Sequence, residues 1–208
     1  MDYSELPTPC RYVIAYWLLA MARGDYEQAM SRLRKKRVGG PEEHCATGVA
    51  CDLFARWWPD IFRWDTENLF YYPDHLVGRE MYSEYEPPMV VIEALGWDYS
   101  CSAQTLVSYA KEYDEDVAIH LGEVNPNKRV KRSLRSWIVS MNDTGMDFEA
   151  IARTMHDLYR GEMDIDLPAD LLEDHGVNGG ANIRAHLHWL GVSQPAGTIT
   201  PSTETTPA

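Results

Sequence analysis

The apolar residues of segment 10–23 constrain the fold most, because they recur at spacings of three and four and so share one face of a helix. The residues of this stripe are Val13, Ile14, Trp17, Leu18 and Met21. The segment is too short to span a bilayer and follows no secretory signal. We therefore expect an amphipathic helix in a cytoplasmic protein whose four cysteines are reduced.

The same periodicity, interrupted by Gly and Pro, predicts further helices along the chain. They span residues 26–37, 41–58, 89–95, 104–120, 128–141, 148–159, 168–174 and 182–190. Asp147 is expected to cap the helix over 148–159. The aromatic segment 60–85 lacks this periodicity and is predicted to be a long loop or a short β-hairpin. The predicted fold class is therefore mainly α, a compact helical domain.

Three regions are expected along the chain. Residues 1–160 are predicted to form a helical core domain and residues 161–193 a C-terminal helical appendage. Residues 194–208 are rich in Pro, Thr and Ser, a composition typical of a disordered tail.

Charge is distributed unevenly along a chain whose formal net charge is −13. Two basic clusters occupy residues 32–37 and 128–135, which leaves the rest strongly acidic and repellent to phosphates and membrane headgroups. Nucleic-acid binding requires the two clusters to converge in space. The candidate contacts are Arg34, Lys35, Arg37, Lys128, Arg129, Lys131 and Arg132. The structural alternative is two solvated helix faces, the first complementing a helix dipole at its C-terminal end.

Cys45 is the sharpest candidate for chemistry, because a thiol in the first turn of a predicted helix is favoured as thiolate. His156 is a candidate distant base, and Asn142 and Asp143 are further catalytic candidates. The structural alternatives are a tight helix crossing, indicated by the small residues that follow Cys45, and an ordinary turn at Asn142-Asp143. No metal or cofactor is expected, because Cys45 and Cys51 fall on different helix faces and no phosphate-binding glycine loop is present.

Four segments stand out in order along the chain, at residues 17–28, 45–53, 87–96 and 140–152. Together they resemble a family of uncharacterised phage and actinobacterial proteins. The second segment is similar to the family's Cys-x-x-Gly-Val-x-Cys-Asp-Leu, and the fourth to its Asn-Asp-x-Gly-x-x-Phe-x-x-Ile-Ala. Ala46 and Ala94 stand where the family has Cys and Trp. The resemblance implies a phage or prophage origin and a shared compact fold, and it implies no activity.

The lack of a catalytic signature, the acidic charge and the aromatic segment favour a non-enzymatic protein that binds a partner. With the resemblance, we expect a phage-encoded accessory protein that modulates a host component in the bacterial cytoplasm, with a host or phage protein as partner and no membrane contact. The aromatic candidates for binding are Trp64, Tyr71, Tyr72 and Tyr82. The alternatives are a small-molecule-binding protein or enzyme that uses Cys45, and a nucleic-acid-binding or virion structural protein.

Overall fold

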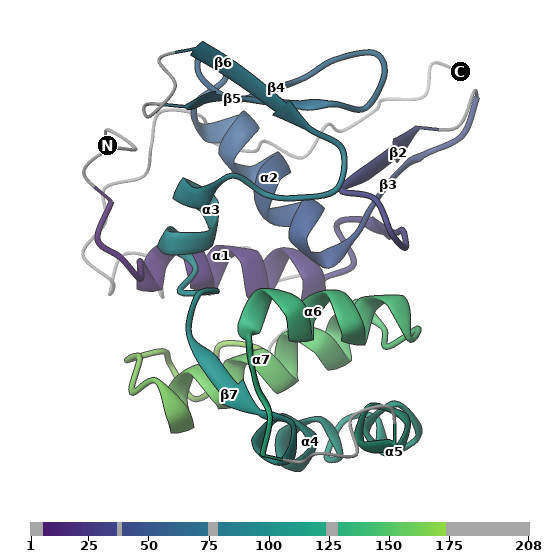
Figure 1. Ribbon diagram of the computed structural model, residues 1–208, viewed down its shortest axis with the longest axis vertical. Coiled ribbons are helices and arrows are strands. Elements are labelled where there is room, and N and C mark those ends of the chain that lie inside the picture. Colours follow the sequence, from purple (N-terminus) through teal and green to yellow (C-terminus); the bar gives the residue numbers. More distant parts are fainter. Residues whose placement is uncertain (1–5, 37–38, 75–78, 124–128, 174–208) are drawn as a thin grey trace, which may run out of the picture.

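The computed structural model describes residues 6–36, 39–74, 79–123 and 129–173. Within these ranges the chain forms seven helices and three small sheets, with 46% of the residues in helices and 15% in strands (Figure 1). The fold is therefore mixed α/β, and the prediction of a mainly α fold was wrong. No helix in the described ranges is both long enough and apolar enough to cross a membrane.

Helix α1 (Arg11–Ala22) forms where the apolar stripe predicted a helix, and it lies at the centre of the molecule rather than with one face in solvent. It is buried on more than one face, because α7 (Phe148–Glu162) packs along it and α2 (Ala46–Trp57) crosses it (Figure 1). The indole of Trp17 donates a hydrogen bond to the carbonyl of Ala46 at 2.8 Å, which joins α1 to the start of α2.

The segment predicted as a helix over 26–37 instead belongs to a three-stranded sheet, in which β3 lies between β1 and β2. The strands are β1 (Glu27–Gln28), β2 (Arg34–Lys36) and β3 (Glu42–His44). Two basic residues of β2 face acidic residues of β3, with Lys35 opposite Glu43 and Lys36 opposite Glu42. Opposite charges at such positions stabilise a strand pair. The hydrophobic periodicity of residues 26–37 does not reveal this pairing, because the acidic partners lie on β3.

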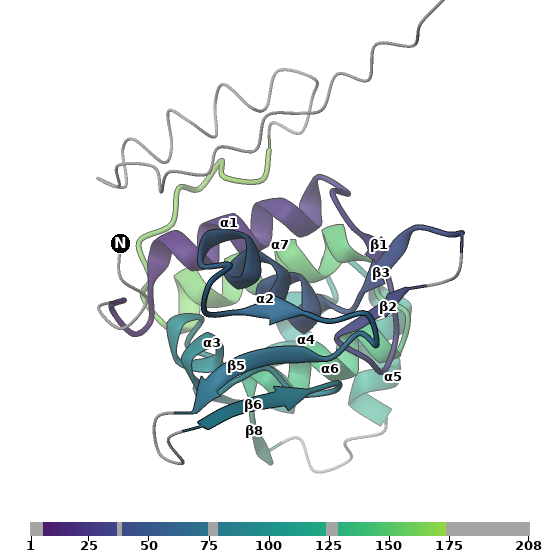
Figure 2. The same cartoon turned by 90° about the horizontal axis from the view of Figure 1, so that it is seen from above.

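A second sheet occupies the aromatic segment 60–85, where three antiparallel strands run in sequence order. The strands are β4 (Arg63–Trp64), β5 (Phe70–Asp74) and β6 (Arg79–Ser83). Strands β5 and β6 form the hairpin that was one of the two predictions for this segment. Seen from above, they lie side by side, while β2 and β3 project to one side of the molecule (Figure 2).

The other half of the chain is mostly helical, with one two-stranded sheet. Its elements are α3 (Met89–Ala94), β7 (Ser100–Ser102), α4 (Ala103–Ala110), α5 (Glu115–Glu123), β8 (Lys131–Ser133), α6 (Leu134–Asp143) and α7. The helix predicted over 104–120 is two helices, because Asp114 accepts a hydrogen bond from the Val117 amide and begins a new one. Asp147 caps α7 as predicted, by accepting from the amide of Ala150 at 2.7 Å.

One hydrophobic core extends from Leu6 to Leu172. Residues 169–173 form turns rather than part of the helix predicted over 168–174, yet Leu171 and Leu172 are buried in this core. The helix predicted over 182–190 and the tail predicted over 194–208 lie outside the described residues.

Candidate functional site

Cys45 lies at the N-cap of α2, where its extended backbone (φ −79°, ψ 168°) leads into the helix. Its Sγ atom accepts a hydrogen bond from the Gly48 amide at 3.3 Å and lies 3.2 Å from the Thr47 hydroxyl oxygen. A side-chain acceptor at this position satisfies an amide that the helix itself leaves without a partner. The thiol therefore has a structural role as a helix cap.

Gly48 allows the first turn of α2 to touch the backbone of the preceding strand region. The Leu33 carbonyl accepts a hydrogen bond from the Cys45 amide at 3.2 Å, and a Cβ atom built on Gly48 would lie 1.7 Å from the same oxygen. Only glycine fits such an approach. The small residues that follow Cys45 predicted a tight helix crossing, but the segment that approaches Gly48 is the backbone directly before β2 and not another helix.

The Asn142 side chain, which is only 2% exposed, joins α6 to α2 and to the loop after β1. Its Oδ1 atom accepts from the Ala46 amide at 3.1 Å and from the Gln28 side chain at 3.3 Å, and its Nδ2 donates to the Ala29 carbonyl at 2.8 Å. A buried amide used in this way on both ends is a structural joint. The structural alternative predicted for Asn142 was an ordinary turn. In the structure its side chain instead connects several separate segments.

Asp143 follows Asn142 but is exposed. Its Oδ1 accepts a hydrogen bond from the amide of Ser31 at 3.0 Å. Ser31 has the left-handed backbone conformation (φ 69°), which residues other than glycine rarely adopt. The carboxylate thus holds the loop between β1 and β2 against the end of α6.

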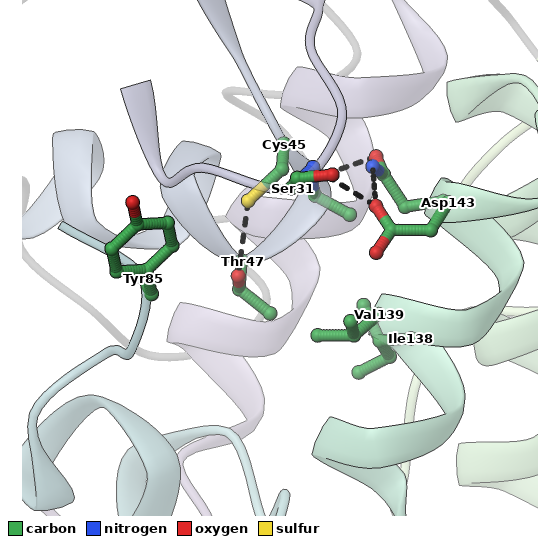
Figure 3. A pocket seen from close by; sticks show the side chains of 9 residues that line it. Ser31, Cys45, Thr47, Tyr85, Ile138, Val139 and Asp143 are labelled. Carbon is green, nitrogen blue, oxygen red and sulfur yellow. Dashed lines mark hydrogen bonds between the residues drawn. The ribbon is translucent and has the colours of Figure 1, made fainter. Parts of the chain in front are cut away.

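These residues surround a small cavity of about 40 Å³ (Figure 3). Its lining consists of Ser31, Cys45, Ala46, Thr47, Tyr85, Ile138, Val139, Asn142 and Asp143. The structure therefore brings together three of the four catalytic candidates and the last tyrosine of the aromatic segment. Sequence reasoning missed Ser31, Thr47 and Val139, because no spacing along the chain indicates that they meet.

His156, the fourth catalytic candidate, does not line this cavity. Its Nδ1 lies 3.1 Å from the Asp157 carboxylate and its Nε2 lies 2.9 Å from the Pro168 carbonyl. No histidine of the described residues bonds to the Cys45 thiol or lines the cavity beside it. The histidine therefore ties α7 to the segment that follows it.

The environment of Cys45 favours the neutral thiol. Burial raises the pKa of this thiol, and the negative charge of Asp143 acts in the same direction, although hydrogen bonds from Thr47 and Gly48 oppose them. Nucleophilic cysteines need the opposite shift and a nearby base. Among the described residues there is also no group of three His, Cys, Asp or Glu side chains that could hold a metal ion.

The four predicted aromatic contacts divide into two kinds. Trp64 donates to the Asp52 carboxylate at 3.1 Å, and Tyr72 packs on Phe70, so these two rings support the fold. Tyr71 and Tyr82 face one another across the strand pair, and Tyr82 is 61% exposed. Of the four rings, Tyr82 is therefore the exposed one, and Tyr71 is half-buried like Trp64 and Tyr72.

The first basic cluster is largely paired with acidic residues in the structure. Arg34 is only 7% exposed, stacks on Trp64 at 4.6 Å and donates to the Asp65 carbonyl at 2.7 Å. Lys36 bonds to Glu42 at 2.8 Å. Lys35 lies on β2 in the same strand pair, and Arg37 lies outside the described residues.

The second basic cluster lies on a different sheet from the first. Arg129 precedes β8, Lys131 and Arg132 belong to it, and Arg132 lies over the ring of Trp137 at 5.1 Å. Lys128 is outside the described residues. The described residues of this cluster thus lie on and before β8 rather than on a helix face, and they belong to a different sheet from β2.

A second polar joint, built around Asp52, connects three of the elements near the cavity. This buried carboxylate accepts from Tyr26 at 2.8 Å, from Arg56 at 2.7 Å and from Trp64. His44 lies 3.9 Å from it, and neither of its ring nitrogens has a hydrogen-bond partner among the residues that the structure describes. Burial lowers the pKa of this histidine.

The hydrogen bonds at Asp52 and Asn142 join three of the four sequence segments in space. Tyr26 and Gln28 come from the first segment, Ala46 and Asp52 from the second, and Asn142 from the fourth.

A comparison with curated proteins and a comparison with solved structures found no significant match to the chain. The family model described as a domain of unknown function (DUF8296) matches residues 11–158, and the chain belongs to that family.

Proposed function

We propose that this protein is a non-enzymatic accessory protein that binds a protein partner. The observation that carries the proposal is a group of exposed side chains around the small cavity, which we call the Tyr85 face. Its members are Met30, Ser31, Tyr85, Val139 and Asp143. Met30 is 45%, Tyr85 55% and Val139 38% exposed. Met30 lies beside the turn after Asp143, since a Cβ atom on Gly145 would lie 3.9 Å from its terminal methyl group.

The physical character of the Tyr85 face supports binding. Tyrosine and methionine are enriched at protein interfaces, and exposed large side chains on a rigid base lose little conformational freedom on binding. The base here is rigid because Asn142 and Cys45 are held by hydrogen bonds to several backbone groups.

The same site argues against an enzyme that uses Cys45. Its thiol is buried, no histidine of the described residues bonds to it, and the cavity of about 40 Å³ is far below the ~300–1,000 Å³ of substrate pockets. Nucleic-acid binding is supported less well, because Arg34 and Lys36 are already bonded to oxygen atoms of this same chain.

The identity of the partner as a host component, and the bacterial cytoplasm as the place of action, rest on the resemblance of the four segments to phage and actinobacterial proteins. The net charge of −13 supports a partner with a basic surface.

Site-specific crosslinking tests the proposal. The photoreactive residue p-benzoylphenylalanine is placed at Tyr85 or Val139, with Ser108 as a control because it is exposed on α4, at the opposite end of the view in Figure 1 from the β4–β6 sheet. We expect positions 85 and 139 to crosslink the same protein in host cells, and position 108 not to do so. Folded protein that crosslinks nothing at 85 and 139, or the same set of proteins from all three positions, contradicts it.

A further inference from the structure

Asp143 offers a fixed carboxylate at the mouth of the cavity. Its Oδ1 accepts hydrogen bonds from Ser31 at 3.0 Å and, more weakly, from Asn142 at 3.4 Å. Its Oδ2 accepts none from the residues that the structure describes. The side chain is thus oriented by one oxygen and presents the other.

No ion pair to this carboxylate is formed within the described part of the chain, and the arginines at positions 32 and 135 are paired elsewhere. Arg32 pairs with Glu84 and lies over the Tyr85 ring at 5.7 Å, while Arg135 pairs with Glu86 at 3.4 Å. Asp143 is also the last residue of α6, where the helix dipole adds negative potential. The site therefore favours a positive charge from outside the chain.

An anion is disfavoured at the same place, although the N-terminus of α2 faces the cavity. The amide of Ala46 already donates to Asn142, and the amide of Gly48 donates to the sulfur of Cys45. Two of the three amides of this first turn are therefore taken, which disfavours a phosphate or carboxylate there.

The walls next to Asp143 suit the stem of a basic side chain. Ile138 and Val139 lie on one side of the cavity and Tyr85 lies across from them (Figure 3). Lysine and arginine bury their methylene groups against apolar surface and keep the charge at a polar end. The cavity of about 40 Å³ has room for the end of one side chain.

We propose that the Tyr85 face recognises a lysine or arginine side chain of its protein partner, which places its cationic group at the Oδ2 atom of Asp143 and its stem between Tyr85 and Val139. This inference rests on the proposed function and names the chemistry of the partner. The net charge of −13 draws a basic protein segment toward the face before contact is made.

The test uses nuclear magnetic resonance of the full ¹⁵N-labelled chain, with N-acetyl-arginine-methylamide and N-acetyl-lysine-methylamide as probes. N-acetyl-glutamine-methylamide is the neutral control. We expect the arginine or lysine probe to shift the amide signals of Ser31, Ala46 and Asp143 in a saturable and salt-sensitive way, and the glutamine probe to shift them at least tenfold less at equal concentration. Equal shifts with all three probes overturn the inference.

Two variants and a matched control locate the effect. Asp143→Asn keeps an oxygen acceptor for the Ser31 amide but removes the charge, and Tyr85→Leu removes the ring. We expect at least a tenfold weaker response to the cationic probes in Asp143→Asn and a several-fold weaker one in Tyr85→Leu. Asp60→Asn removes an exposed carboxylate from the turn after α2 and is expected to change nothing.

The outcomes separate this inference from the proposed function. If Asp143→Asn retains the fold and the full response to the cationic probes, the inference is wrong. If position 85 still crosslinks its partner in that variant with undiminished yield, the partner binds without a cationic anchor, and the proposed function stands while the inference fails. If wild-type protein crosslinks no partner at all, the proposed function itself fails.

Discussion

At the scale of single residues, Cys45 shows how a thiol can be positioned like a catalytic group and still act as a cap. We predict that Cys45→Ser leaves the free energy of unfolding unchanged to within about 0.5 kcal/mol, because serine is a preferred N-cap residue and supplies an acceptor for the Gly48 amide. Cys45→Ala removes that acceptor and is expected to cost about 1 kcal/mol. Urea unfolding followed by circular dichroism measures both values.

Cys51 provides the contrast for this prediction, because it is completely buried. A serine at position 51 places a hydroxyl group in the core, and we expect a loss of about 1–3 kcal/mol. If Cys45→Ser lowers the free energy of unfolding as much as Cys45→Ala does, the side-chain acceptor at position 45 contributes nothing to stability.

Gly48, in the first turn of α2, has no room for a side chain. In Gly48→Ala, the new methyl group collides with the Leu33 carbonyl, a backbone atom that cannot rotate away, and we expect a loss of at least about 1–3 kcal/mol. The matched control is Gly122→Ala in α5, where nothing lies within 4 Å of the added Cβ. Alanine there is expected to stabilise the helix by up to about 1 kcal/mol. The two midpoints of thermal unfolding should move in opposite directions, and a parallel decrease would contradict the crossing geometry.

At the scale of elements, the Asn142 joint holds α6 against the start of α2. We predict that Asn142→Ala lowers the free energy of unfolding by at least about 2 kcal/mol, because the Ala46 amide and the Ala29 carbonyl are left buried without partners. Ser108→Ala, an exposed change on α4, is expected to stay within about 0.5 kcal/mol of wild type. A cost at Asn142→Ala equal to that of the Ser108 control would mean that water replaces the bonds.

His44 makes the junction of β3, α2 and β4 sensitive to acid. Burial lowers its pKa in the folded protein, so below its ordinary value of about 6.5 the unfolded chain binds a proton that the folded chain rejects. Asp52, at 3.9 Å, and Glu42 attract that proton, whereas Arg34 and Arg56 repel it, and burial is the largest effect.

We therefore predict that stability is fully present above about pH 6.5 and falls as the pH drops below that value. His44→Phe keeps a ring between Tyr26 and Trp64 but cannot titrate. Urea unfolding at pH 7.5 and pH 5.0 should show a smaller loss in this variant than in wild type. An identical pH dependence in both proteins would place the acid sensitivity elsewhere.

The contrast between predicted and observed elements has a physical basis. Helix α1 and the Asp147 cap of α7 could be predicted, because periodicity and capping act within a few residues. Strands β1, β2 and β3 could not, since each has only two or three residues and depends on charges or bonds from another segment. The candidate site was predicted in part for the same reason. Cys45 and Asn142 have local signals, whereas their meeting with Ser31 and Tyr85 is decided by tertiary packing.

At the scale of the whole molecule, the core does not end where the family match ends. The matched region stops at residue 158, yet Tyr159, Leu167, Leu171 and Leu172 are all buried in the same core. The His156 side chain holds the Pro168 carbonyl at 2.9 Å, and the Tyr159 hydroxyl donates to the Leu95 carbonyl at 2.8 Å. The segment after α7 thus contributes packing as well as hydrogen bonds to the matched region.

We predict that the folding unit extends beyond residue 160, the boundary expected from the sequence. Two shortened chains, 1–173 and 1–160, differ only in the segment that carries Leu167, Leu171 and Leu172. We predict that 1–160 is less stable than 1–173 by several kcal/mol, because burying one leucine contributes about 1.5–3 kcal/mol. Urea midpoints of the two chains measure the difference, and Leu171→Ser in the full chain, expected to be destabilising, shows whether the effect belongs to burial. Equal midpoints for both shortened chains would instead make residues 161–173 an appendage to a domain that is complete at 160.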